Sequence, residues 1–118
     1  MGPPLTARRW HILREGATLT LARQLPVRFD VGVVAEFPKM GKLRLAQQVR
    51  QDMWRALRGV RGFSPVVHVQ EQDHGLRLRA GGRVEGPAPR AGLETIIAGV
   101  LACPRNRARW AAFAGRRA

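Results

Sequence analysis

The sequence predicts an α+β domain, in which a four-stranded antiparallel sheet has two or three helices packed on one face. Two observations indicate this class. Apolar and polar residues alternate in several short segments, which is the period of a β-strand, and apolar residues recur every third or fourth position in longer segments, which is the period of a helix. These segments follow in the order ββαββα, and two antiparallel hairpins with helices on one side are the simplest arrangement of that order.

The first two strands are predicted between residues 17 and 37. Residues 17–25 alternate, and apolar residues occupy every second position from Val27 to Phe37. Only residues 24–26 separate the two runs, so we expect an antiparallel hairpin. On the sheet face away from the helices, the second strand should display Arg28, Asp30 and Glu36.

The period changes to helical after Pro38 and Gly41. From Lys42 to about Gly59, apolar residues fall on one side of a helix. Asp52, the only acid in this segment, is placed at the edge of the polar side. The apolar side, which we expect to be buried, consists of Leu45, Ala46, Val49, Met53, Ala56, Leu57 and Val60.

A second hairpin follows this helix. Residues 66–71 and 76–80 read as strands, and residues 72–75 form the turn between them. The pair Gly81-Gly82 is expected to bulge or to end the second strand. The free sheet face would also carry Arg77 and Arg79 with His68 between them, and a solvated surface of mixed charge is the plain expectation for such a face.

The C-terminal part is predicted to be helical. A helix begins near Arg90, and Cys103-Pro104 ends it. Asn106 is expected to cap a short last helix that carries Trp110 and Phe113. The apolar stripe of the first of these helices consists of Leu93, Ile96, Ile97, Val100 and Leu101.

A chain of 118 residues is expected to form one domain. We assign residues 1–15 to a basic N-terminal arm, in which Thr6 would begin one helical turn containing Trp10 and Leu13. Residues 16–118 are assigned to a single basic α+β domain. The hydrophobic fraction of 45% and the charged fraction of 25% are ordinary for a folded protein.

The charge is the unusual property of this sequence. It has 21 Lys and Arg residues against 8 Asp and Glu residues, which gives a formal net charge of +13, and Lys39 and Lys42 are the only lysines. We therefore expect an anionic partner, because such a field attracts polyphosphate without any specific motif. A genome composition that favours Ala and Gly also favours Arg, so the arginines have a second explanation that does not involve function.

Composition also excludes several classes of protein. A single cysteine, Cys103, forms no internal disulfide, which favours a reducing compartment, and we expect the cytoplasm. No apolar run approaches the roughly 20 residues that a membrane-spanning helix needs. The first fifteen residues lack the apolar centre of a secretory signal.

Candidate catalytic groups are few. Cys103 lies at a predicted helix end, where the helix dipole disfavours a thiolate. His11, His68 and His74 show none of the local spacings of zinc ligands. Residues 39–42 follow a strand and open a helix but lack the remaining residues of a phosphate-binding P-loop. We therefore assign no catalytic residue, metal or cofactor. We favour a protein that is not an enzyme, and a nuclease or nucleotide-handling activity is the enzymatic alternative.

The polar side of helix 42–58 is the strongest candidate for a binding surface. Guanidinium groups match phosphate oxygens, and Gln reaches base edges or sugar hydroxyls. Trp54 lies on the flank beside Arg50 and Arg61, where an indole can stack on an unpaired base. A helix rich in Arg and Gln is also simply a well solvated helix. With the basic C-terminal run added, the predicted nucleic-acid-binding residues are Lys42, Arg44, Gln48, Gln51, Trp54, Arg55, Arg58, Arg61, Arg105, Arg107 and Arg109.

Two functions are consistent with these observations. We favour a nucleic-acid-binding module, with RNA or a ribonucleoprotein preferred over DNA. The alternative is a non-catalytic accessory or structural subunit of a larger assembly, in which the arginines meet an acidic protein surface and Trp10, Trp54 and Trp110 anchor the interface. A homo-oligomer formed by extension of the sheet across a two-fold axis also remains open, since the sequence does not identify the edge.

Overall fold

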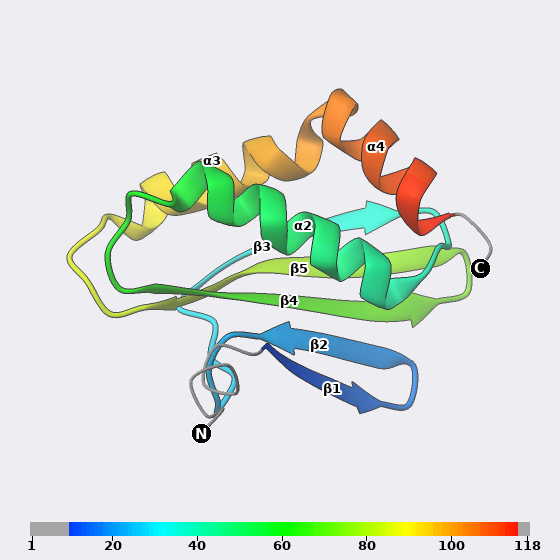
Figure 1. Cartoon of the computed structure of the whole chain (residues 1–118), viewed down its shortest axis with the longest axis horizontal. Coiled ribbons are helices and arrows are strands. Elements are labelled where there is room, and N and C mark those ends of the chain that lie inside the picture. Colours follow the sequence, from blue (N-terminus) through cyan, green and yellow to red (C-terminus); the bar gives the residue numbers. More distant parts are fainter. Residues whose placement is uncertain (1–9, 116–118) are drawn as a thin grey trace, which may run out of the picture.

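A five-stranded antiparallel sheet with three helices forms the described part of the chain, which in this computed structural model is residues 10–115 (Figure 1). The sheet order is β1-β2-β4-β5-β3. The α+β class is confirmed, whereas the predicted number and order of strands are wrong. The elements are β1 (His11–Glu15), β2 (Thr18–Ala22), β3 (Val31–Phe37), α2 (Lys42–Leu57), β4 (Phe63–Gln72), β5 (Gly75–Val84), α3 (Arg90–Ala102) and α4 (Pro104–Ala114).

The first hairpin is formed by different strands from those predicted. β2 pairs with β1 and β4, and β3 pairs only with β5, so the predicted pairing of residues 17–25 with residues 27–37 is wrong. A two-residue loop, Gly16-Ala17, closes the β1–β2 hairpin, and the φ of +59° at Gly16 suits such a tight connection. Because β1 takes one side of β2 and β4 takes the other, residues 23–30 leave the sheet and cross to its far edge.

Strand β1 also corrects the expected N-terminal arm. His11–Glu15 forms an extended strand, so the helical turn expected around Trp10 and Leu13 is wrong. Thr6 and the rest of residues 1–9 lie outside the described residues. The division into an arm of residues 1–15 and a domain of residues 16–118 stays a prediction.

One sheet face packs against the helices. Residues in register share a face, and two rows cross the sheet under the helices, Leu19–Val69–Leu78–Ala35 and Leu21–Val67–Ala80–Val33. Helices α2 and α3 bury their apolar sides against these rows, which confirms the predicted helix faces in most positions. Ala56 and Ile96 are exceptions, because both are exposed. Strand β1 is exposed and lies beyond the helices, whereas β2 packs against α2 (Figure 1).

In the part of the chain that the structure describes, the other sheet face has no helix against it. One row across it runs Leu13–Thr20–His68–Arg79–Val34. His68, Arg79 and Glu36 lie on this face as predicted, and Arg77 pairs there with Glu36 at 3.0 Å. Arg28 and Asp30 do not belong to it, because β3 begins only at Val31. Asp30 instead accepts hydrogen bonds from Arg28 and from the backbone N–H of Val84.

Two glycines let β5 continue beyond its predicted end. A Cβ at Gly81 would lie 2.0 Å from the Val31 carbonyl oxygen, and one at Gly82 would lie 2.1 Å from the Ser64 carbonyl oxygen. Gly82 also has a φ of +150°, which favours glycine. Gly81-Gly82 therefore neither bulges nor ends the strand. It allows β3 and β4 to approach β5 from both sides.

The last helix begins earlier than predicted. α3 ends before Cys103-Pro104 as expected, but Pro104 is itself the first residue of α4. Proline is favoured at this position because its missing N–H would have no helical partner. Asn106 therefore lies inside the first turn and does not cap the helix. Its Nδ2 donates to the Val100 carbonyl at 3.1 Å and ties α4 to α3.

Candidate nucleic-acid interface

Asp52 connects the two basic segments that the sequence singled out. It is buried, not placed at the solvated edge of helix α2 as predicted, because the indole of Trp110 packs beside it. Its Oδ2 accepts hydrogen bonds from Trp110 at 2.6 Å and from Arg109 at 2.9 Å. At the other end of the junction, the N–H of Gly41 donates to the Ala114 carbonyl at 2.9 Å. Helices α2 and α4 are therefore held side by side.

Several predicted phosphate ligands take part in intramolecular contacts. Lys42 pairs with Glu71 at 3.1 Å, and Arg109 pairs with Asp52. Arg107 donates to the carbonyls of Leu101 and Glu36 at 2.8 and 3.1 Å, and its guanidinium lies 4.1 Å from the Phe37 ring centroid. These three cations take part in contacts within the fold, and Arg107 in particular is half-buried and uses its Nε and Nη1 donors on backbone carbonyls.

Other predicted residues remain available on the surface. Arg55 is exposed and reaches Asp52 only at 3.5 Å. Arg44 and Arg58 lie over the rings of Phe113 and Trp54, at 5.6 and 5.5 Å. Within residues 10–115, no acidic side chain forms an ion pair with any of four predicted arginines, namely Arg44, Arg58, Arg61 and Arg105. Gln51 is exposed, and Gln48 is half-buried.

A pocket of about 270 Å³ lies beside the C-terminal half of α2. Trp54 lines it, as do Phe63 and Ser64 at the start of β4 and Trp10, Arg23 and Gln24 at the ends of the β1–β2 hairpin. Among the described residues, no acidic side chain lines it. Among these residues the sequence had assigned only Trp54 to nucleic-acid binding and had named Trp10 only as an anchor of the alternative protein interface, because nothing in it showed that strand pairing would bring Trp10 to this position.

Arginine side chains surround the two indoles of this pocket. The guanidinium groups of Arg50 and Arg23 lie 4.9 and 5.9 Å from the Trp10 ring centroid. The Nε atom of Arg50 is buried and has no hydrogen-bond partner. Burial lowers the pKa of the Arg50 guanidinium from its ordinary value.

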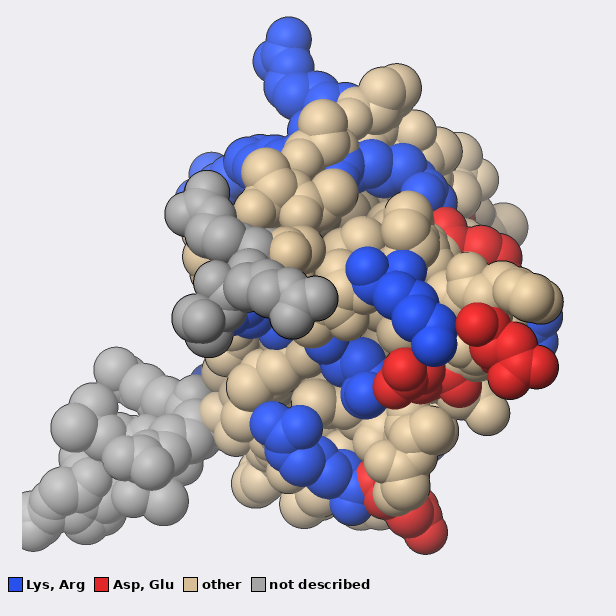
Figure 2. All heavy atoms as spheres, turned by 90° about the vertical axis from the view of Figure 1, so that its right-hand side faces the viewer, with Lys and Arg blue, Asp and Glu red and all other residues tan. Residues whose placement is uncertain are grey.

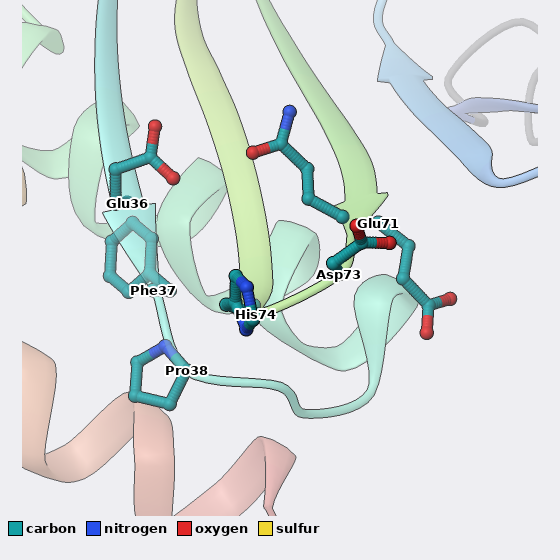
Figure 3. A pocket seen from close by; sticks show the side chains of 8 residues that line it. Glu36, Phe37, Pro38, Glu71, Asp73 and His74 are labelled. Carbon is teal, nitrogen blue, oxygen red and sulfur yellow. The ribbon is translucent and has the colours of Figure 1, made fainter.

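A second hollow lies at the opposite end of the sheet, near the β4–β5 turn. It measures about 790 Å³, and its lining includes Glu36, Glu71, Asp73 and His74. Figure 3 shows the carboxylates of Glu36 and Glu71 pointing apart, and each is paired with a cation, Arg77 and Lys42 respectively. Figure 2 shows basic side chains next to acidic ones at this end of the molecule. Within residues 10–115, no group of three or more His, Cys, Asp or Glu residues can hold a metal ion.

Comparisons with known proteins give no relative. No protein family matches the sequence, and no curated protein or solved structure shows significant similarity to it. Among the described residues, no helix has the length and apolar character needed to cross a membrane. Function is therefore inferred from the side chains themselves.

Proposed function

We propose that this chain binds nucleic acid, with RNA preferred over DNA, through the exposed side of α2, the pocket beside its C-terminal half and the basic side chains of α4. The observation that supports this most directly is the exposed indole of Trp54, which is 47% accessible and has the guanidinium of Arg58 at 5.5 Å. A flat aromatic surface next to an unpaired cation offers stacking to a base and an ion pair to its phosphate.

The distribution of charge supports the same function. The formal net charge is +13, and Arg58, Arg61 and Arg105 form no ion pair with an acidic side chain within residues 10–115. Each phosphate that such a cation neutralises releases counterions, so binding to a polyanion should weaken steeply with salt. Arginine is suited to this role because its planar guanidinium presents several donors to phosphate oxygens.

The test removes three unpaired arginines together. In the variant Arg58→Gln, Arg61→Gln, Arg105→Gln, we expect weaker binding to single-stranded RNA and a slope of log K against log salt that is shallower by about 2, since each neutralised phosphate of a single strand contributes about 0.7. A matched control, Arg28→Gln, Lys39→Gln, Arg77→Gln, removes the same charge at exposed cations that are paired with acids. Equal losses in the two variants, or no loss in the first, would contradict the proposal.

The second candidate function is that of an accessory subunit bound to an acidic protein surface. The open sheet face favours it, because Leu13 and Val34 are exposed apolar side chains in one row with Arg79. Arg79 is exposed and forms no ion pair with an acidic side chain within residues 10–115. Affinity isolation of the tagged chain with and without nuclease treatment separates the two functions. A stoichiometric protein that persists after digestion supports the subunit, whereas partners lost with the nucleic acid support RNA binding.

A further inference from the structure

We infer that the pocket between Trp10 and Trp54 binds one unpaired nucleobase together with its phosphate, so that the chain recognises single-stranded rather than duplex nucleic acid. This inference rests on the proposed function and names the ligand class of one part of that interface. Three properties of the pocket carry it, namely its size, its aromatic surfaces and its charge.

The size of the pocket suits one ring system. Its volume of about 270 Å³ is just below the range of about 300 to 1,000 Å³ that is typical of sites for drug-sized ligands. A duplex does not enter such a space, and a base reaches it only when it is splayed out of a strand. Trp54 is half-exposed at the pocket, so entry from solvent is open.

The lining presents aromatic surfaces and a small polar group. Three aromatic rings line it, namely those of Trp10 directly before β1, Trp54 in α2 and Phe63 at the start of β4. The Ser64 hydroxyl donates to Oε1 of Gln24 at 3.2 Å, which leaves the Gln24 amide nitrogen as a donor without a partner in the described structure. Aromatic faces stack on any base, and a Gln amide can bond a base edge. This combination recognises a planar heterocycle better than an aliphatic or purely anionic ligand.

The charge around the pocket calls for an anionic ligand. Arg50 stacks on Trp10 and has a buried Nε without a hydrogen-bond partner, and Arg58 stacks on Trp54. Within residues 10–115, no acidic side chain lines the pocket to compensate these two charges. A cationic or neutral aromatic ligand would leave this charge uncompensated, whereas the phosphate of a nucleotide would pair with it. A heterocycle that carries phosphate is therefore the class that satisfies both the rings and the arginines.

The test uses the tryptophan fluorescence of the complete chain. Trp110 is fully buried, whereas Trp54 is exposed at the pocket, so a ligand there should quench part of the emission. Titration with each of the four ribonucleoside monophosphates is compared with ribose 5-phosphate and inorganic phosphate, which carry no base. We expect saturable quenching by the nucleotides and none by the other two ligands.

Two aromatic variants provide the matched comparison. Trp54→Ala should weaken nucleotide binding, followed by calorimetry, by about tenfold or more, because stacking of one base on one aromatic side chain has that order of effect. Phe113→Ala is the control. It removes an aromatic ring of similar exposure, which also has an arginine, Arg44, over its face but does not line the pocket. This variant should leave the affinity for nucleotides unchanged. Both side chains are exposed, so both variants should fold, which thermal melting verifies.

Several outcomes would overturn the inference, and they are distinguishable from failure of the proposed function. Equal affinity for nucleotides and ribose 5-phosphate would show that the pocket binds the phosphate without the base. Equal effects of the two variants would show that the base binds outside the pocket. If RNA binds but no nucleotide quenches Trp54, the pocket assignment fails and the proposed function stands. If nucleotides bind in the pocket but RNA does not bind, the polymer function fails and the nucleotide site stands.

Discussion

The indole Nε1 of Trp110 donates a 2.6 Å hydrogen bond to Oδ2 of Asp52, across the junction between α4 and α2. Asp52 is the one charged side chain in the core of residues 10–115, with 8% of its surface exposed. Arg109 supplies the compensating charge at 2.9 Å. This pair therefore holds α4, and the arginines it carries, beside the basic side of α2.

Asp52→Ala should destabilise the fold by about 3 kcal/mol, because it leaves the buried Trp110 N–H unpaired and removes the partner of Arg109. Asp52→Asn keeps an acceptor for the indole and should cost about 1 kcal/mol. Urea unfolding measures both values. Glu85→Ala, which removes an exposed acid with weaker ion pairs, is the control and should change the stability by less than about 1 kcal/mol. A loss in Asp52→Ala no larger than in this control would contradict the structural role of the pair.

Substitution of Arg107 should lower the stability of the fold, whereas substitution of Arg105 should lower the affinity for RNA, although the sequence placed both residues in one basic cluster. Arg107→Ala removes hydrogen bonds to the Leu101 and Glu36 carbonyls and a stack on Phe37, so we expect a loss of about 2 kcal/mol of stability. Arg105→Ala should leave the melting temperature unchanged and weaken RNA binding instead. Paired melting and RNA-binding measurements check both. Similar behaviour of the two variants would refute the distinction.

The sequence predicts well what depends on local periodicity. The buried side of α2 follows from the spacing of Leu45, Val49 and Met53, and the structure confirms it. Periodicity also placed alternating side chains of β3 correctly, from Val31 to Phe37. These patterns depend only on the 3.6- and 2-residue repeats of helix and strand.

The features that the sequence did not predict depend on which segments meet in space. Residues 11–15 have too short a pattern to show a strand, and without β1 neither the edge position of β3 nor the approach of Trp10 to Trp54 can be foreseen. Asp52 lies next to the buried Met53 in sequence, but only the hydrogen bond from Trp110 and the charge of Arg109, both from α4, make burial of its carboxylate tolerable. The candidate site was therefore predicted on α2 and missed on the neighbouring strands.

Gly81→Ala should be among the most destabilising single substitutions in the sheet. The new methyl group would lie 2.0 Å from the Val31 carbonyl oxygen, so β3 and β5 would have to separate, and we expect a loss of more than about 3 kcal/mol. Gly99→Ala is the control, because nothing lies within 4 Å of its Cβ in helix α3, and it should stabilise by about 0.5 to 1 kcal/mol. Thermal unfolding measures both. Equal effects of the two substitutions would contradict the close approach of the strands.

Stability should fall as the solution is acidified, and Asp30 should account for part of that fall. Its hydrogen bond from Arg28 and that from the Val84 N–H lower its pKa from the ordinary value of 3.8. A carboxyl whose pKa is lower in the folded chain than in the unfolded chain stabilises the fold above the unfolded value, and this contribution is lost as pH falls through the folded value. The pKa of Glu71 is lowered in the same sense by Lys42 and Lys39, so it adds to the effect.

The corresponding measurement is urea unfolding at a series of pH values from 6 down to the acid limit of folding. We expect the free energy of unfolding to be steady at the upper end and to decline below about pH 5, where the unfolded carboxyls begin to bind protons. In Asp30→Asn the decline should be shallower, because the amide still accepts from Val84 but no longer titrates. Asp73→Asn, which removes an exposed carboxylate that forms no ion pair within residues 10–115, should retain the parent slope. An unchanged slope in Asp30→Asn would show that its contacts with Arg28 and Val84 do not favour the ionised form in solution.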